Sequence, residues 1–162
     1  MNKNVIGISA GAVGGVVGAW LMRQLMAVWH RNWGASPRDG AFGLDEEADI
    51  RSVEMLAMKL CNKPVSRVEA QRVAAALHYA YGVGAGAFYG WAANRIPAVR
   101  TGFGTAYGAA LWLVGDELAI SASGVSNPKQ KSAASHLAAL SAHLAFGAVA
   151  EFMRRVAAGI QK

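Results

Sequence analysis

The segment VIGISAGAVGGVVGAWLM (residues 5–22) decides the fold, because it is apolar and carries glycines four residues apart. Gly7, Gly11 and Gly15 have the spacing that places side chains on one face of a helix. A face of glycines lets another backbone approach closely, as in helix pairs packed inside membranes. The same spacing recurs at Gly82, Gly86, Gly90, Gly104 and Gly108. We therefore predict a glycine zipper, a tight helical bundle whose glycine faces are buried either within the chain or between copies.

The composition indicates a membrane protein of one domain over residues 1–162. The chain is 54% hydrophobic and only 16% charged, whereas soluble domains carry about 25% charged residues. A helix of about 20 apolar residues spans a bilayer, and four segments satisfy this requirement: 5–29, 73–94, 102–121 and 133–153. The fold predicted from the sequence is thus an all-α bundle of four transmembrane helices in a lipid bilayer.

Residues 30–72 form the only substantial segment predicted to lie outside the membrane. The turn-rich stretch 33–43 is followed by DEEADIRSVEMLAMKLC (45–61), whose apolar residues have helical spacing with charges opposite. This pattern predicts an amphipathic helix, lying on the membrane surface or against the bundle. Pro64 ends it, and Ser66 with Glu69 forms a capping box. The second long helix is therefore expected to begin near Ser66.

The segment LWLVGDELAIS (111–121) places two carboxylates inside an apolar run. Short connections make consecutive helices antiparallel, and at about 1.5 Å per residue several ionisable groups then fall roughly 5–9 Å below the same membrane edge. Such groups tend to face the bundle interior and to pair. We predict a polar layer of five residues: Arg23, His78, Asp116, Glu117 and His136. This layer is either a structural network with interfacial anchors or a site for an ion, proton or ligand.

His143 and Glu151 continue one face of the last helix away from this layer. Together with the layer they form either a proton relay across the bilayer or a set of interhelical hydrogen bonds. No ligand geometry is fixed by the sequence, so we predict no metal and no cofactor. No nucleophile lies near a base, so no enzyme activity is predicted. An interfacial aromatic belt is expected at Trp29, Trp33, Tyr79, Tyr81 and Trp91.

The formal net charge of +6 does not indicate nucleic-acid binding. The basic residues lie mostly between the apolar runs, with no basic stripe and no recognition motif. They are slightly more numerous on the side of residues 30–72, so the positive-inside rule predicts that this side is cytoplasmic and that the termini lie on the opposite side of the membrane. The single cysteine, Cys61, excludes an intrachain disulfide.

Three segments resemble the YagU-like bacterial inner-membrane proteins, a family without an established biochemical activity. They are HYAYGVGAGAFYG (78–90), GFGTAYGAALWLVGDELA (102–119) and HLAALSAHLAFG (136–147), and the similarity covers about residues 64–153. The resemblance implies a small multi-pass helical protein of the bacterial inner membrane and supplies no reaction.

Two functions from different classes follow from these patterns. The first is a structural or accessory membrane protein that uses its glycine faces to assemble as a homo-oligomer or within a larger complex. The second is a small proton- or ion-linked transporter or sensor that uses the polar layer. A water-accessible cavity that reaches Asp116 would distinguish the second function from the first.

Overall fold

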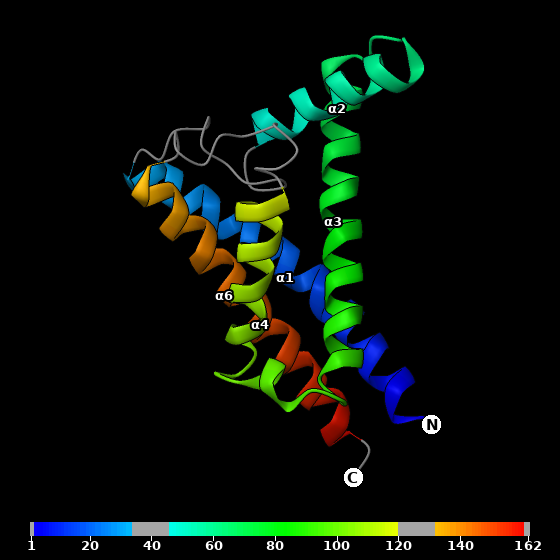
Figure 1. Cartoon of the computed structure of the whole chain (residues 1–162), viewed down its shortest axis with the longest axis vertical. Coiled ribbons are helices and arrows are strands. Elements are labelled where there is room, and N and C mark those ends of the chain that lie inside the picture. Colours follow the sequence, from blue (N-terminus) through cyan, green and yellow to red (C-terminus); the bar gives the residue numbers. More distant parts are fainter. Residues whose placement is uncertain (1, 34–45, 120–131, 161–162) are drawn as a thin grey trace.

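The computed structural model describes residues 2–33, 46–119 and 132–160, and every long element in that part of the chain is a helix (Figure 1). The turn-rich stretch 33–43, the loop 122–132 and the end of the third predicted span at 120–121 lie almost entirely outside these residues. The helices are α1 (Lys3–Trp33), α2 (Glu46–Cys61), α3 (Arg67–Ala92), the 3₁₀-helix η2 (Pro97–Arg100), α4 (Thr105–Leu111), the π-helix η3 (Trp112–Ala119) and α6 (Ala133–Gly159).

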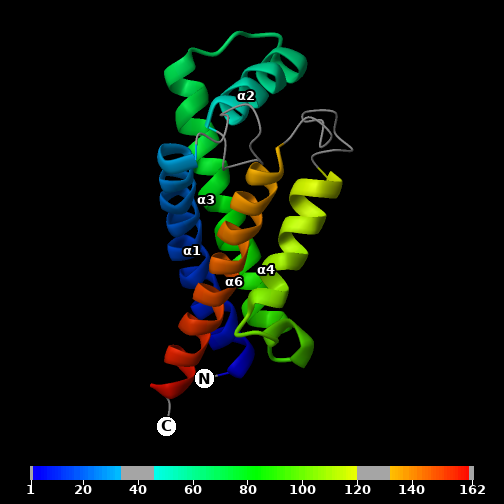
Figure 2. The same cartoon turned by 90° about the vertical axis from the view of Figure 1, so that its left-hand side faces the viewer.

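Helix α1 is the centre of the bundle. It packs along both α3 and α6, whereas α4 packs mainly on α6, and α2 packs on α3. The two termini lie at one end of the molecule and α2 crosses the other end, as both views show (Figures 1 and 2). The all-α class predicted from the sequence is therefore confirmed.

Among the described residues, two helices are long and apolar enough to cross a membrane, one within α1 (Lys3–Trp29) and the other α6 (Ala133–Gly159). Helix α3 contains glycines, tyrosines and a histidine, which lower its hydropathy. The third predicted span is divided between α4 and η3. The arrangement with four spans thus stays a prediction.

Helices α1 and α3 contact each other through their glycines. Carbonyl oxygens of Gly82, Gly86 and Gly90 lie where Cβ atoms at Gly15, Gly11 and Gly7, respectively, would stand. The Gly90 oxygen would be 2.6 Å from a Cβ at Gly7. Real Cβ atoms essentially never approach a heavy atom this closely. The close backbone contact is therefore made within one chain. We call it the α1–α3 glycine contact.

Helix α6 also makes close contacts at glycines, with α4 on one side and with α1 on the other. A Cβ at Gly108 would meet the carbonyl oxygen of His143, and one at Gly104 would meet that of Gly147. On the other side, a Cβ at Gly14 of α1 would lie 3.0 Å from Cα of Ala150. The small residues thus let α6 approach α1 and α4 closely.

The third predicted span, 102–121, does not begin as a continuous helix. Gly102, Phe103 and Gly104 all have positive φ, of 61°, 58° and 86°. L-residues with side chains rarely adopt this left-handed conformation, which glycine adopts readily. The chain therefore turns here before α4 begins at Thr105, and the Arg155 guanidinium lies over the Phe103 ring at 4.6 Å.

The amphipathic helix and the capping box are both present as predicted. The Ser66 hydroxyl accepts a hydrogen bond from the Glu69 backbone N–H, and the Glu69 carboxylate accepts one from the Ser66 backbone N–H at 2.9 Å. These contacts, the backbone one foremost, lower the pKa of the Glu69 carboxyl. In α2, Ile50 and Val53 are buried against α3, while Leu60 is 73% exposed. Only the first half of α2 thus packs on the bundle.

The α1–α3 glycine contact predicts opposite effects for two neighbouring substitutions. Gly86→Ala places a methyl group against the α1 backbone and should lower the free energy of unfolding by about 1–3 kcal/mol. Gly84 lies on the same helix, and a Cβ added there would have nothing within 4 Å. Gly84→Ala should therefore stabilise the helix by about 0.5–1 kcal/mol. Unfolding of both variants in detergent measures this, and a stabilising Gly86→Ala would contradict the contact.

Candidate functional site

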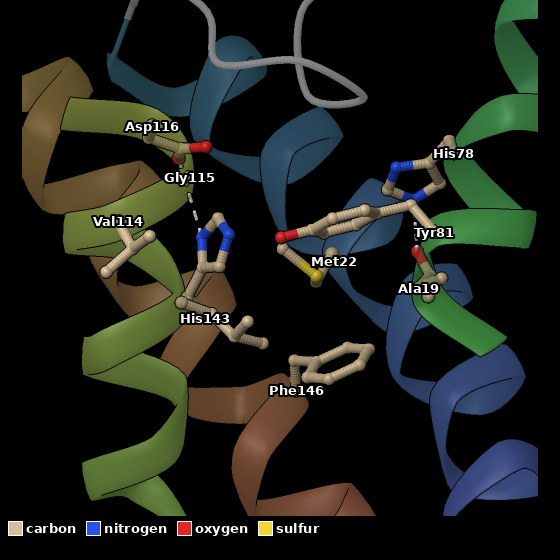
Figure 3. Close-up of a pocket in the computed structure, with 11 residues that line it drawn as sticks. Ala19, Met22, His78, Tyr81, Val114, Gly115, Asp116, His143 and Phe146 are labelled. Carbon is tan, nitrogen blue, oxygen red and sulfur yellow. Dashed lines mark hydrogen bonds and ion pairs between the residues drawn. The ribbon is translucent and has the colours of Figure 1, made fainter. Parts of the chain in front are cut away.

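A pocket of about 300 Å³ lies between α1, α3, η3 and α6 (Figure 3). Its polar lining groups are His78 of α3, Asp116 of η3, His143 of α6 and Tyr81 of α3. The other lining residues are apolar or glycine: Ala19, Met22, Gly82, Leu111, Val114, Gly115 and Phe146. Helices α3, η3 and α6 thus bring ionisable groups from distant parts of the chain into one cavity.

Asp116 and His143 form the ionisable pair of the pocket. Oδ2 of Asp116 lies 3.7 Å from Nδ1 of His143, and the two residues are 4% and 5% exposed. The same Nδ1 lies 2.9 Å from the carbonyl oxygen of Ala139. A carbonyl only accepts, so Nδ1 carries the proton and donates it to Ala139. In neutral His143, Nε2 is then an acceptor, and in Figure 3 it lies on the pocket side of the ring.

His78 and Tyr81 bound the pocket from α3. Nε2 of His78 donates to the carbonyl oxygen of Ala19 at 3.1 Å, which fixes the orientation of this ring against α1. The Tyr81 ring extends across the pocket with its hydroxyl directed toward His143 (Figure 3). The sequence assigned Tyr81 to an interfacial belt. Tyr81 follows His78 by three residues and therefore shares its helix face. This spacing is the feature of the sequence that could have placed Tyr81 in the pocket.

The π-helix η3 determines where Asp116 points. A π-helix uses i→i+5 hydrogen bonds and often occurs at functional sites. Its wider turn changes the rotation expected from the α-helical 100° per residue, and Asp116 faces the pocket beside Gly115. Glu117 follows in the same helix, but its side chain lies outside the described part of the structure.

The pocket contains some residues of the predicted polar layer and not others. His78 and Asp116 line it together, joined by His143, which the sequence placed deeper in the membrane. Arg23 of α1 is half-buried and does not line the pocket. His136 instead contacts the edge of the Trp112 ring, with centroids 6.4 Å apart.

Glu151 belongs to a separate ionic cluster near the end of the molecule where the termini lie. Its side chain is fully buried and accepts hydrogen bonds from Arg154 at 2.6 and 2.8 Å, from Arg155 at 2.7 Å and from the Tyr89 hydroxyl at 2.7 Å. Arg154 binds both carboxylate oxygens, the strongest geometry for such a pair. Sequence reasoning missed these partners, although Arg154 and Arg155 follow Glu151 at helical spacing.

Aromatic side chains lie next to both the pocket and Glu151, because Phe146 lines the pocket and Tyr89 binds Glu151. Phe146 lies at one end of the pocket, and the Tyr89 and Tyr107 rings pack with centroids 5.0 Å apart. The Tyr107 hydroxyl donates to the carbonyl oxygen of Ala85 at 2.7 Å. Among the described residues, the hydrogen bonds of these side chains do not join His143 to Glu151, so the relay predicted from the sequence stays a prediction.

No group of three or more histidine, cysteine, aspartate or glutamate side chains is arranged to hold a metal ion within the described ranges. The chain matches none of the protein-family models, curated proteins or solved structures with which we compared it. The resemblance to the YagU-like proteins therefore stays a prediction.

The Asp116–His143 pair predicts a specific energetic coupling. Residues in contact show interaction energies of about 0.5–3 kcal/mol in double-mutant cycles. We expect such a coupling between Asp116→Asn and His143→Gln in unfolding experiments, and a smaller one when Asp116→Asn is combined with Arg23→Gln. Equal coupling in the two cycles would mean that His143 is not the partner of Asp116.

The Glu151 cluster predicts a large loss of stability on Glu151→Gln. This change leaves the Arg154 side chain, which is 15% exposed, without its carboxylate. Breaking a buried pair costs about 3–5 kcal/mol. The control is Arg155→Gln, because the Arg155 side chain is 56% exposed and exposed pairs contribute about 1 kcal/mol or less. Chemical unfolding in detergent gives both values, and similar losses would contradict this ranking.

Proposed function

We propose that the chain is an integral membrane protein in which α1, α3, α4 with η3, and α6 all cross the bilayer. Each of these spans has large apolar side chains on its outer surface, such as Val13, Phe88, Leu113 and Phe152, which are 56%, 53%, 50% and 54% exposed. Such exposure over a whole bundle is unusual for soluble monomers. The resemblance to the YagU-like proteins favours a bacterial inner membrane, and the charge bias favours periplasmic termini.

We further propose that the protein is a small proton- or ion-linked transporter or sensor. The observation that carries this proposal is the placement of Asp116 and His143 in a cavity rather than in a packed helix contact. Ionisable groups inside a membrane bundle mark proton and ion sites when they line a cavity. The cavity volume of about 300 Å³ leaves room for a bound species beside the carboxylate.

The structural or assembly function is less supported. The faces that favoured it, Gly7–Gly11–Gly15 and Gly82–Gly86–Gly90, are occupied by each other within one chain. Gly104 and Gly108 are likewise occupied by α6. Association into a homo-oligomer or a larger complex remains part of the proposal, but it would use the apolar outer surfaces of the helices.

The proposed function predicts that Asp116 exchanges its proton with water. We expect the infrared spectrum of the protein in liposomes to show a protonated-carboxyl band that changes with pH. Asp116→Asn should remove this band, because an amide has no such proton, while the control Glu54→Gln on α2 should leave it intact. A pH-dependent band that survives Asp116→Asn would overturn the assignment of Asp116 as the ion-linked group.

A further inference from the structure

We propose that the pocket binds a hydrophobic organic cation, an ammonium compound with an apolar or aromatic substituent, which enters from the lipid between α3 and η3. The inference rests on the proposed function, since it takes Asp116 as the group that binds the ion. It adds the chemical class of the ligand and the path by which that ligand arrives.

The pocket lining combines one carboxylate with apolar and aromatic walls. Asp116 is an acceptor in its ionised form and would stabilise a positive charge. The rings of Tyr81 and Phe146 and the side chain of Met22 lie around the same space (Figure 3). Aromatic faces attract cations, and sites for quaternary ammonium groups are built from them. The volume of about 300 Å³ is at the lower limit of small-molecule pockets.

The same lining disfavours divalent metal cations and anions. Calcium takes six to eight oxygen ligands and magnesium a near-octahedral set, whereas the lining side chains that carry oxygen are Asp116 and Tyr81. An anion would be repelled by Asp116. An ammonium group would instead lie in the cavity beside the Asp116 carboxylate, next to His143. Neutral His143 would keep its Nδ1–H bond to Ala139.

The exposed lining residues show where the pocket opens. Tyr81 of α3 and Val114 of η3 both line it and are 53% and 59% exposed. The neighbouring outward side chains are apolar on both helices, with Phe88 and Leu118 at 53% and 59% exposure. In a bilayer this side of the pocket faces the lipid. A ligand that partitions into the membrane would therefore reach Asp116 from the side.

The test is calorimetric titration of the purified full chain in nonionic detergent with benzyltrimethylammonium chloride. Phenylacetate, an anion of similar size, and sodium chloride are titrated in parallel. We expect saturable binding of benzyltrimethylammonium and none of the other two. Asp116→Asn should weaken binding about tenfold or more, because it removes the charge partner in a medium of low dielectric. The control Glu54→Gln should leave the affinity unchanged.

A second variant covers the case in which Asp116→Asn does not fold. Tyr81→Leu alters a side chain that is more than half exposed and should fold, but it should weaken benzyltrimethylammonium binding about threefold by loss of the aromatic face. Binding of phenylacetate equal to that of the ammonium probe would overturn the inference, as would unchanged affinity in both variants. If the pH-dependent carboxyl band is observed and is lost in Asp116→Asn, but benzyltrimethylammonium does not bind, the inference fails while the proposed function stands.

Discussion

The α1–α3 glycine contact is the constraint on which the rest of the structure depends. Where the carbonyl oxygens of one helix occupy the Cβ positions of the other, neither helix can rotate or slide without a clash. Helix α1 then has a second face, with Gly14 and Gly18, against α6. Helices α3 and α6 are thus both held on α1, and α4, which is followed directly by η3, packs mainly on α6. The side between α3 and η3 is left as the place where the pocket opens.

The features that the sequence predicted well are those with local or periodic causes. The capping box at Ser66 and Glu69 depends on residues three apart, and its bonds are present. The spacing of Gly7, Gly11 and Gly15 indicates a close helix contact whatever the partner is, and the structure supplies the partner, α3. The amphipathic pattern of 45–61 likewise corresponds to α2.

The site was harder to predict because it depends on helix rotation and on pairing between distant helices. Depth along the membrane placed Asp116 with His78, but it could not exclude Arg23 or His136, which the structure places outside the pocket. An α-helix turns 100° per residue, whereas Asp116 lies in a π-helix, whose wider turn points its side chain in another direction. The left-handed turn at Phe103 is a second feature that helical periodicity does not predict.

The two buried carboxylates differ in whether a cavity lies beside them, and this difference locates the chemistry. Glu151 accepts hydrogen bonds from Arg154, Arg155 and Tyr89 at 2.6–2.8 Å, so its charge is matched by protein groups. A carboxylate held in this way has little capacity for a further ligand. Asp116 instead lines a cavity, with Nδ1 of His143 3.7 Å from its Oδ2. An exchangeable proton or cation is better accommodated at Asp116 than at Glu151.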